Sequence, residues 1–358
     1  IWLNTGEGGL SPFHIEGGAD LVFQIGTAKY GCRDENGKLS DEKLKGIAAL
    51  SQVRMFEIKL SQGAKPGKGG ILPGPKVTAE IARIRGIPEG MASISPNRHP
   101  EVDSIASLLD LVCHVREVTG KPVGFKLVLG AYEWLDDLCE EINRRGIEHA
   151  PDFITLDSAD GGSGAAPMPL IDYVGLPIWE SLPMLCDALE RHALKTRIRV
   201  NASGKLITPA EVAWAICVGA DFVSSARGYM FSLGCIQALQ CNKNTCPTGI
   251  TTHNPRLQRG LDVTDKAERV RRYAERVTQE VCVIAHSCGV TEPRRLGREH
   301  ARIMGSDGVS MSLSDYYSRW AVPEKRPSNK GEARPLFEAD APSRIVALPE
   351  DYRNAKSS

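Results

Sequence analysis

The amino-acid sequence predicts an α/β fold built as a (β/α)8 barrel. Short apolar segments alternate along the chain with longer segments of helical spacing, and glycine-rich or polar turns follow the apolar segments. Strands that alternate with helices of about 10–15 residues form parallel βαβ units. The chain has 358 residues, which is enough for one barrel and an extension. We predict the barrel over residues 1–290, with an inserted cysteine loop over 235–249. An extension over 291–358 is expected to pack on the barrel or on a neighbouring subunit.

Each predicted element follows from its local pattern. Apolar runs predict strands, and apolar residues at helical spacing predict helices. The predicted strands are 1–4, 21–26, 53–60, 123–128, 152–157, 198–202 and 221–225. The predicted helices are 41–49, 77–85, 104–119, 132–145, 179–193, 208–218 and 263–286. The helix after Thr208 has the clearest signals, because Pro209 and Glu211 complete a capping box and Gly219 follows its last turn. One further strand upstream of residue 1 is expected to close the barrel.

The composition narrows the classes of function. Lys plus Arg and Asp plus Glu number 44 each, so no net charge favours nucleic acid or an anionic membrane. No run of 18 apolar residues is present, although an anchor upstream of residue 1 would be invisible here. Most of the ten cysteines are scattered, which is typical of a reducing compartment and predicts a cytoplasmic protein.

Glycine-rich segments follow several of the predicted strands. In a (β/α)8 barrel these strand ends meet at one face, where the active site lies, and phosphate is usually bound after the last two strands. Here those two positions carry Ser203-Gly204 and Ser225-Ala226-Arg227, whose amides and guanidinium suit a phosphate. Turn glycines and a surface arginine are the alternative interpretation. Lys126 ends an apolar strand, so it is expected to face a ligand or a carboxylate.

The segment 61–74 is predicted to be a long loop that is rich in glycine and carries lysines. Loops of this length are uncommon unless they are functional or disordered. Lys65 and Lys68 on a glycine-rich backbone suit an anionic ligand, and a solvated, mobile loop is the alternative.

Three cysteines form the pattern C-x5-C-x4-C at Cys235, Cys241 and Cys246, with Pro247 after the last. Thiolates on an irregular loop are the ligands that iron–sulfur clusters need. Three local thiolates without a fourth fit a three-iron cluster. Three buried free thiols are the alternative, and a zinc site is disfavoured because C-x2-C pairs are absent and His253 lies outside the cysteine cluster.

Together these motifs resemble the FMN-binding synthase domain of glutamate synthase, especially its single-domain relatives. The resemblance covers roughly residues 4–289. It depends on Asn-Thr-Gly-Glu-Gly-Gly at 4–9, Gln-Gly-Ala-Lys-Pro-Gly at 62–67, Asp-Gly-Gly-Ser-Gly-Ala at 160–165 and the cysteine loop with Cys-Pro-Thr-Gly at 246–249. Each glycine motif alone is weak, but four in this order with the three cysteines are specific.

The resemblance implies two cofactors, FMN and a [3Fe–4S] cluster on Cys235, Cys241 and Cys246. It implies that 2-oxoglutarate and ammonia give 2-iminoglutarate, which a hydride from reduced FMN converts to L-glutamate. The catalytic residues would be Lys65, Glu7 and Gln62, and the substrate carboxylates would bind Lys65 and Arg85, with Gln62 close by. The cofactor-binding residues would be Lys59, Lys126, Asp160, Gly161, Gly162, Ser203, Gly204, Ser225, Ala226 and Arg227.

Two positions depart from the family pattern. Glutamate synthases usually have an acidic residue where Lys68 stands and glutamine where Ile71 stands. An N-methylglutamate synthase, which uses methylamine in place of ammonia, is therefore one alternative. An electron-transfer or scaffold subunit without turnover is another. The expected partners are a keto acid, ammonia or an amine, and an electron donor, either ferredoxin or a flavoprotein that oxidises NAD(P)H. No nucleic acid is expected, and a homo-oligomer is allowed.

Overall fold

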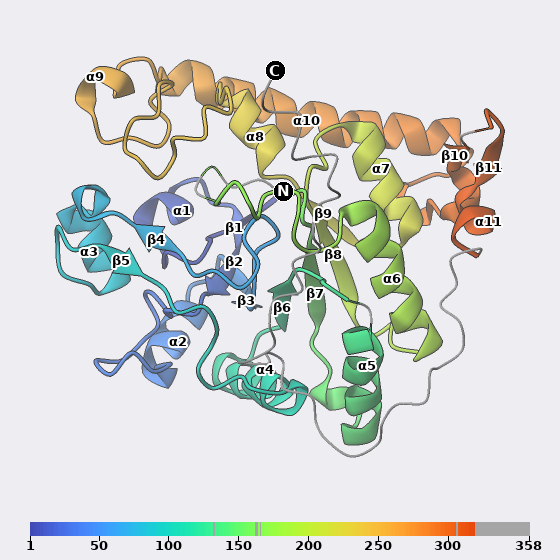
Figure 1. Cartoon of the computed structure of the whole chain (residues 1–358), viewed down its shortest axis with the longest axis horizontal. Coiled ribbons are helices and arrows are strands. Elements are labelled where there is room, and N and C mark those ends of the chain that lie inside the picture. Colours follow the sequence, from blue (N-terminus) through green and yellow to red (C-terminus); the bar gives the residue numbers. More distant parts are fainter. Residues whose placement is uncertain (132, 162–163, 165, 306, 319–358) are drawn as a thin grey trace, which may run out of the picture.

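Seven parallel strands in one sheet form the framework of the protein (Figure 1). The computed structural model describes residues 1–131, 133–161, 164, 166–305 and 307–318. The strand order is β1-β2-β3-β6-β7-β8-β9. The strands are β1 (Trp2–Asn4), β2 (Asp20–Ile25), β3 (Val53–Lys59), β6 (Val123–Leu127), β7 (Phe153–Asp157), β8 (Arg199–Ser203) and β9 (Phe222–Ser224). Neighbours in this order are also neighbours in the βαβ succession, which is the topology of a (β/α)8 barrel. The predicted fold class is confirmed, and β1 and β9 stand at the two ends of the strand order.

The main helices lie close to their predicted positions. They are α2 (Asp41–Ala48), α3 (Ala79–Arg85), α4 (Ile105–Thr119), α5 (Glu133–Arg145), α6 (Ile178–Arg191), α7 (Pro209–Val218) and α10 (Val263–Ser287). The capping box at the start of α7 is present, because Thr208 Oγ1 accepts from Glu211 N and Glu211 Oε2 accepts from Thr208 N. Local cap signals therefore place this helix correctly.

Several short elements were not predicted. The expectation of a loop over 61–74 is wrong at its end, because β4 (Ile71–Leu72) pairs with β5 (Ser93–Ile94) and the 3-10 helix η1 (Gly74–Lys76) follows. Strands of two residues are too short for periodicity to reveal. The other unpredicted elements are α1 (Pro12–Glu16), η2 (Ile147–His149), α8 (Arg227–Ser232), α9 (Pro255–Gln258), η3 (Pro293–Arg295), η4 (Arg298–His300), β10 (Arg302–Met304), β11 (Ser310–Ser312) and α11 (Leu313–Ser318).

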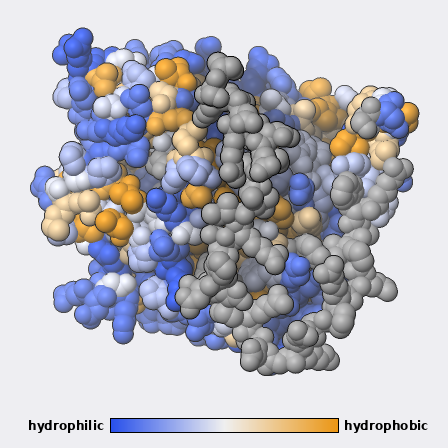
Figure 2. Space-filling view, in the orientation of Figure 1, coloured by the Kyte–Doolittle hydropathy of each residue, from blue (hydrophilic) through white to orange (hydrophobic). Residues whose placement is uncertain are grey.

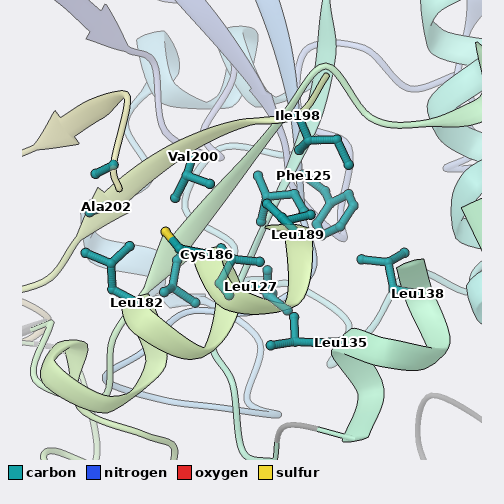
Figure 3. Packing of buried hydrophobic residues seen from close by; sticks show 14 of the residues in the cluster. Phe125, Leu127, Leu135, Leu138, Leu182, Cys186, Leu189, Ile198, Val200 and Ala202 are labelled. Carbon is teal, nitrogen blue, oxygen red and sulfur yellow. The ribbon is translucent and has the colours of Figure 1, made fainter. Parts of the chain in front are cut away.

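The hydrophobic core lies between the sheet and its helices. Figure 3 shows Phe125 and Leu127 of β6 and Val200 of β8 against Leu135 of α5 and Leu182 of α6. All five side chains are buried, because helices cover the outer face of the parallel strands. Each such side chain contributes about 1.5–3 kcal/mol of transfer free energy when it is buried.

Part of the chain beyond residue 290 also reaches this core. Leu313 and Tyr317 of α11 are buried in the same cluster, and Arg298 Nη2 lies 2.5 Å from Asp187 Oδ1 of α6. No helix among the residues described is long and apolar enough to cross a membrane. On the surface, apolar side chains gather on the side that carries β4 and β5, where Ile71, Met91 and Ile94 are exposed (Figure 2).

Candidate functional site

A buried carboxylate joins several strands inside the barrel. Glu57 on β3 is only 1% exposed and accepts hydrogen bonds from Asn4 Nδ2 at 2.9 Å, Gln24 Nε2 at 2.7 Å and Thr155 Oγ1 at 2.5 Å. Asn201 Nδ2 on β8 donates to Thr155 Oγ1 at 3.1 Å and continues the network. Sequence analysis missed this network. A polar residue within each of several apolar strands is the signal that could have indicated it.

One cavity, with a volume of about 310 Å³, opens at the carboxyl end of β3. Its polar lining includes the predicted residues Glu7, Lys59, Gln62 and Lys65. Lys59 Nζ donates to Glu7 Oε2 at 3.0 Å and to Gln62 Oε1 at 3.1 Å. Burial raises the pKa of Glu7, but Lys59, Lys65 and Arg85 outweigh burial and hold the pKa below its usual value. Glu7 is therefore an anion at neutral pH.

Lys65 is a buried cation in the lining of this cavity. It is 8% exposed, and no ion pair to it is present within the described part of the chain. Burial lowers the pKa of Lys65, and Lys59 and Lys68 lower it further, while Glu7 raises it. A buried ammonium without a carboxylate is costly unless a ligand supplies the anion.

Arg85 is held beside this cavity, although it is not part of the cavity lining. Arg85 Nη1 donates to Ser93 Oγ at 3.2 Å, and its guanidinium carbon lies 4.9 Å from the centre of the Tyr30 ring. The Tyr30 hydroxyl and Ser93 Oγ are 2.5 Å apart. Arg85 is thus fixed in position without a carboxylate partner among the described ion pairs.

The Glu7–Lys59 pair makes a pH prediction. Because the folded pKa of Glu7 is below 4.5, the pair's stabilisation is fully present above the unfolded value and is lost as pH falls through the folded pKa. We expect Glu7→Gln to lower the free energy of unfolding by about 1 kcal/mol near neutral pH, and the difference to shrink below about pH 4.5. Urea unfolding over a pH series measures this. A difference that grows toward acid pH would contradict it.

A second cavity, with about 470 Å³ of space, lies over the ends of β6, β8 and β9. Lys126 Nζ lies 3.3 Å from Asp157 Oδ2 at its edge. Burial lowers the pKa of Lys126, but Asp157 and Glu57 outweigh burial and raise it. The predicted residues in its lining are Gln62, Lys126, Gly161, Ser203, Gly204, Ser225, Ala226 and Arg227. Gln62 lines both cavities, so the two are adjacent.

The walls of the second cavity fit a phosphate-bearing cofactor. Gly204 has φ of +131°, and a Cβ there would lie 2.1 Å from Ser158 Oγ, so only glycine fits. Ser158 Oγ, behind Gly204, is buried and has no hydrogen-bond partner within the part of the chain that the structure describes. Arg227 was expected in a loop but is the first residue of α8.

Of the predicted cofactor residues, Asp160 is placed differently. Asp160 does not line either cavity, and its Oδ2 accepts from Ile178 N at 3.3 Å, at the start of α6. Gly162 lies outside the described residues.

Cys235, Cys241 and Cys246 are free thiols of intermediate exposure. Burial raises the pKa of Cys246, but hydrogen bonds from Thr248 and Thr251 outweigh burial and lower it to about 6. Within the described residues, no group of three or more His, Cys, Asp or Glu side chains is placed to hold a metal ion. The thiols are therefore suited to metal binding in their chemistry, but they do not form a ligand group in this structure.

The chain is similar to several known proteins. Residues 1–291 match the family described as a conserved region in glutamate synthase. The glutamate synthase large subunit-like protein YerD of Bacillus subtilis is 43% identical over 314 residues, which cover 88% of this chain and 59% of that protein. The archaeal glutamate synthase [NADPH] of Methanocaldococcus jannaschii is 32% identical over 85% of this chain and 56% of its own. Among solved structures, a flavocytochrome b2 mutant with benzoylformate matches with a TM-score of 0.49 and 16% identity, over 93% of this chain and 66% of that one.

A barrel with glycines and an arginine around one cavity and lysines around the adjacent one has the features of proteins that bind an anionic cofactor. More specifically, the chain belongs to the glutamate synthase family, in its FMN-binding region. The family consists of oxidoreductases, which confirms the predicted resemblance and the predicted class of enzyme. The chain spans less than three fifths of the length of the two curated relatives described above.

Proposed function

We propose that this chain provides the FMN site of an enzyme that reductively aminates 2-oxoglutarate to L-glutamate by way of 2-iminoglutarate. The observation that carries the proposal is Lys65, a buried cation without an ion-pair partner among the described residues, in a cavity that shares Gln62 with the cofactor cavity. Adjacent cavities for cofactor and substrate are what a direct transfer between them requires.

The second cavity holds FMN in this proposal. Ser203, Gly204, Ser225, Ala226 and Arg227 bind the phosphate through backbone amides and the guanidinium. Lys59 and Lys126 lie against the ring and its side chain, where positive charge stabilises the reduced cofactor. When bound, FMN supplies the hydride.

The first cavity binds the keto acid. Lys65 and Arg85 each form a charge-assisted hydrogen bond with one carboxylate of the substrate. Glu7 is ionised, so it accepts protons from the amine or orients it rather than donating a proton. Gln62 is held by Lys59 and lies where the reacting carbon would meet the cofactor.

The remaining parts of the proposal concern electrons and partners. C-x5-C-x4-C within the family region and the lowered pKa of Cys246 support a [3Fe–4S] cluster on Cys235, Cys241 and Cys246. Such a cluster passes electrons from a ferredoxin or from a flavoprotein that oxidises NAD(P)H. The described cysteines, all free, support a cytoplasmic protein, and a homo-oligomer is part of the proposal.

A second candidate changes the amine. Lys68 lines the first cavity, and Ile71 is 53% exposed on the adjacent β4, where the family usually has an acidic residue and a glutamine. These two substitutions favour an alkylamine such as methylamine, which gives N-methylglutamate.

Anaerobic single-turnover measurement separates the candidates. The chain is loaded with FMN, reduced with dithionite, and mixed with 2-oxoglutarate plus ammonium or plus methylamine. Stoichiometric reoxidation of the flavin with ammonium supports glutamate formation, and faster reoxidation with methylamine supports the second candidate. No reoxidation with either amine would exclude both and leave an electron-transfer or scaffold role.

The cofactor cavity makes its own prediction. Gly204→Ala places a Cβ against Ser158 Oγ at a strained φ, so we expect at least a tenfold loss of FMN affinity and about 1–3 kcal/mol of stability. The matched control is Gly37→Ala in an exposed turn, where φ is +76° and no atom lies within 4 Å of the added Cβ. Gly37→Ala introduces an unfavourable positive φ but no steric clash, so it controls for backbone strain alone. Equal flavin content, measured by absorbance, in the Gly204 variant and the wild type would contradict the assignment.

A further inference from the structure

A buried lysine outside both cavities contacts the cysteine loop. Lys76, the last residue of η1, is 8% exposed. Its Nζ donates to Cys241 O at 2.7 Å and to Thr251 O at 2.9 Å. No carboxylate pairs with it among the described ion pairs. Burying the Lys76 ammonium costs desolvation free energy, and two backbone carbonyls offset only part of that cost. The contact is therefore a specific interaction and differs from that of a solvated surface lysine.

The two carbonyls belong to a loop whose backbone is fixed from within. Asn244 has φ of +62°, an unusual conformation for a residue other than glycine. Its side-chain oxygen accepts from His253 N at 2.7 Å, and its carbonyl accepts from Thr252 Oγ1 at 2.7 Å. A Cβ on Gly164 would lie 2.1 Å from Cys241 Sγ, so this residue packs directly on the thiol. Cys241 thus contacts Gly164 through its thiol and Lys76 through its carbonyl.

Residues 67–76 connect the first cavity to Lys76 within one short segment. Gly67 and Gly70 line the cavity, and a Cβ on Gly70 would lie 2.7 Å from Glu7 Oε1. The segment continues through β4, which pairs with β5, and Ser93 of β5 accepts from Arg85. Lys76 Nζ contacts Cys241 O across 165 residues of sequence. The start of the segment 67–76 therefore lies at the first cavity, and its last residue contacts the cysteine loop.

We propose that Lys76 is a positioning residue that fixes the cysteine loop to the segment 67–76, so that binding of a dicarboxylate in the first cavity and the order of the loop around Cys241 and Cys246 are coupled. The inference rests on the proposed function for the identity of the dicarboxylate. The physical basis is a shared contact, because a ligand that orders this segment also orders whatever Lys76 holds.

Hydrogen exchange on the full FMN-loaded chain tests the coupling. In the wild type, we expect saturating 2-oxoglutarate to slow amide exchange in residues 238–252 at least about fivefold. Lys76→Met keeps the length of the side chain and removes its donors, so exchange in 238–252 should be faster without ligand and unchanged by ligand. Lys76→Arg retains charge and donors and should restore the ligand effect. Lys45→Met on the exposed surface of α2 is the matched control and should behave as the wild type.

Calorimetric binding of 2-oxoglutarate separates the inference from the proposed function. If the wild type binds the keto acid and exchange in 238–252 does not change, the coupling is wrong while the proposed function stands. If the wild type does not bind it, the proposed function is wrong. In that case, faster exchange in ligand-free Lys76→Met still supports the positioning role, and unchanged exchange overturns it. A far-ultraviolet circular dichroism spectrum equal to that of the wild type shows that the variant is folded.

Discussion

Glu57→Ala is expected to lower the free energy of unfolding by about 3–5 kcal/mol, which makes it the most destabilising single substitution that we predict. The carboxylate is 1% exposed and accepts from Asn4, Gln24 and Thr155. Alanine leaves these donors buried without an acceptor and opens a cavity among the strands that carry them. Urea unfolding followed by far-ultraviolet circular dichroism measures the loss.

Two further variants test whether the loss of stability comes from the hydrogen-bond network of Glu57 or from the loss of any carboxylate charge. Glu57→Gln keeps one acceptor oxygen for Asn4 and Gln24 but places an amide donor against Thr155 Oγ1, so it should cost about 1–3 kcal/mol. Glu42→Ala removes an exposed carboxylate on α2 and should change stability by less than about 0.5 kcal/mol. A loss below 1 kcal/mol for Glu57→Ala would show that the donors find water instead, and that the network is not structural.

The barrel itself could be predicted because its signals are local. The alternation of apolar strands with helices, and cap signals such as those of Thr208 and Gly219, are properties of neighbouring residues. The predicted bounds of the main helices and strands agree with the structure to within a few residues. Seven parallel strands follow from that alternation once the connections are assumed to be right-handed and short.

The site could be predicted only in part, because its contacts join distant segments. The strand-end rule brought Lys126 and Gly204 to one face, the resemblance added Lys59, and the structure places all three around the two cavities. The same rule says nothing about Tyr30 and Ser93, which position Arg85 although Tyr30 is more than 50 residues away from it in sequence. Their residue types are common in any core, so no local pattern distinguishes them.

In the cysteine loop, too, the sequence indicates the chemistry of the residues but not their geometry. The spacing of Cys235, Cys241 and Cys246 indicates which atoms could bind iron, but not how an irregular loop directs them. Lys76 lies at the end of a segment that was predicted to be a loop, and its contact with Cys241 joins positions 165 residues apart. The Lys76 ammonium meets the carbonyls of Cys241 and Thr251 only in the folded protein, so no local pattern predicts these hydrogen bonds.

Lys65→Met is expected to reduce kcat/KM for 2-oxoglutarate by about 10²–10³-fold, which corresponds to roughly 3–4 kcal/mol of transition-state binding. Methionine matches the length and apolar stem of lysine but cannot pair with a carboxylate. FMN content should not change, because Lys65 lines the first cavity and not the second. The rate of flavin reoxidation as a function of 2-oxoglutarate concentration measures the effect.

Stability provides the discriminating control for this variant. Because Lys65 is buried and has no ion-pair partner among the described residues, its removal should leave the free energy of unfolding unchanged or raise it by about 1 kcal/mol. The exposed variant Lys45→Met should alter neither quantity. The lowered pKa of Lys65 adds a second signature: activity should fall with rising pH before ordinary lysines deprotonate, and this decline should be absent in Lys65→Arg, whose guanidinium stays charged. A loss of activity that accompanies an equal loss of stability would instead assign Lys65 a structural role.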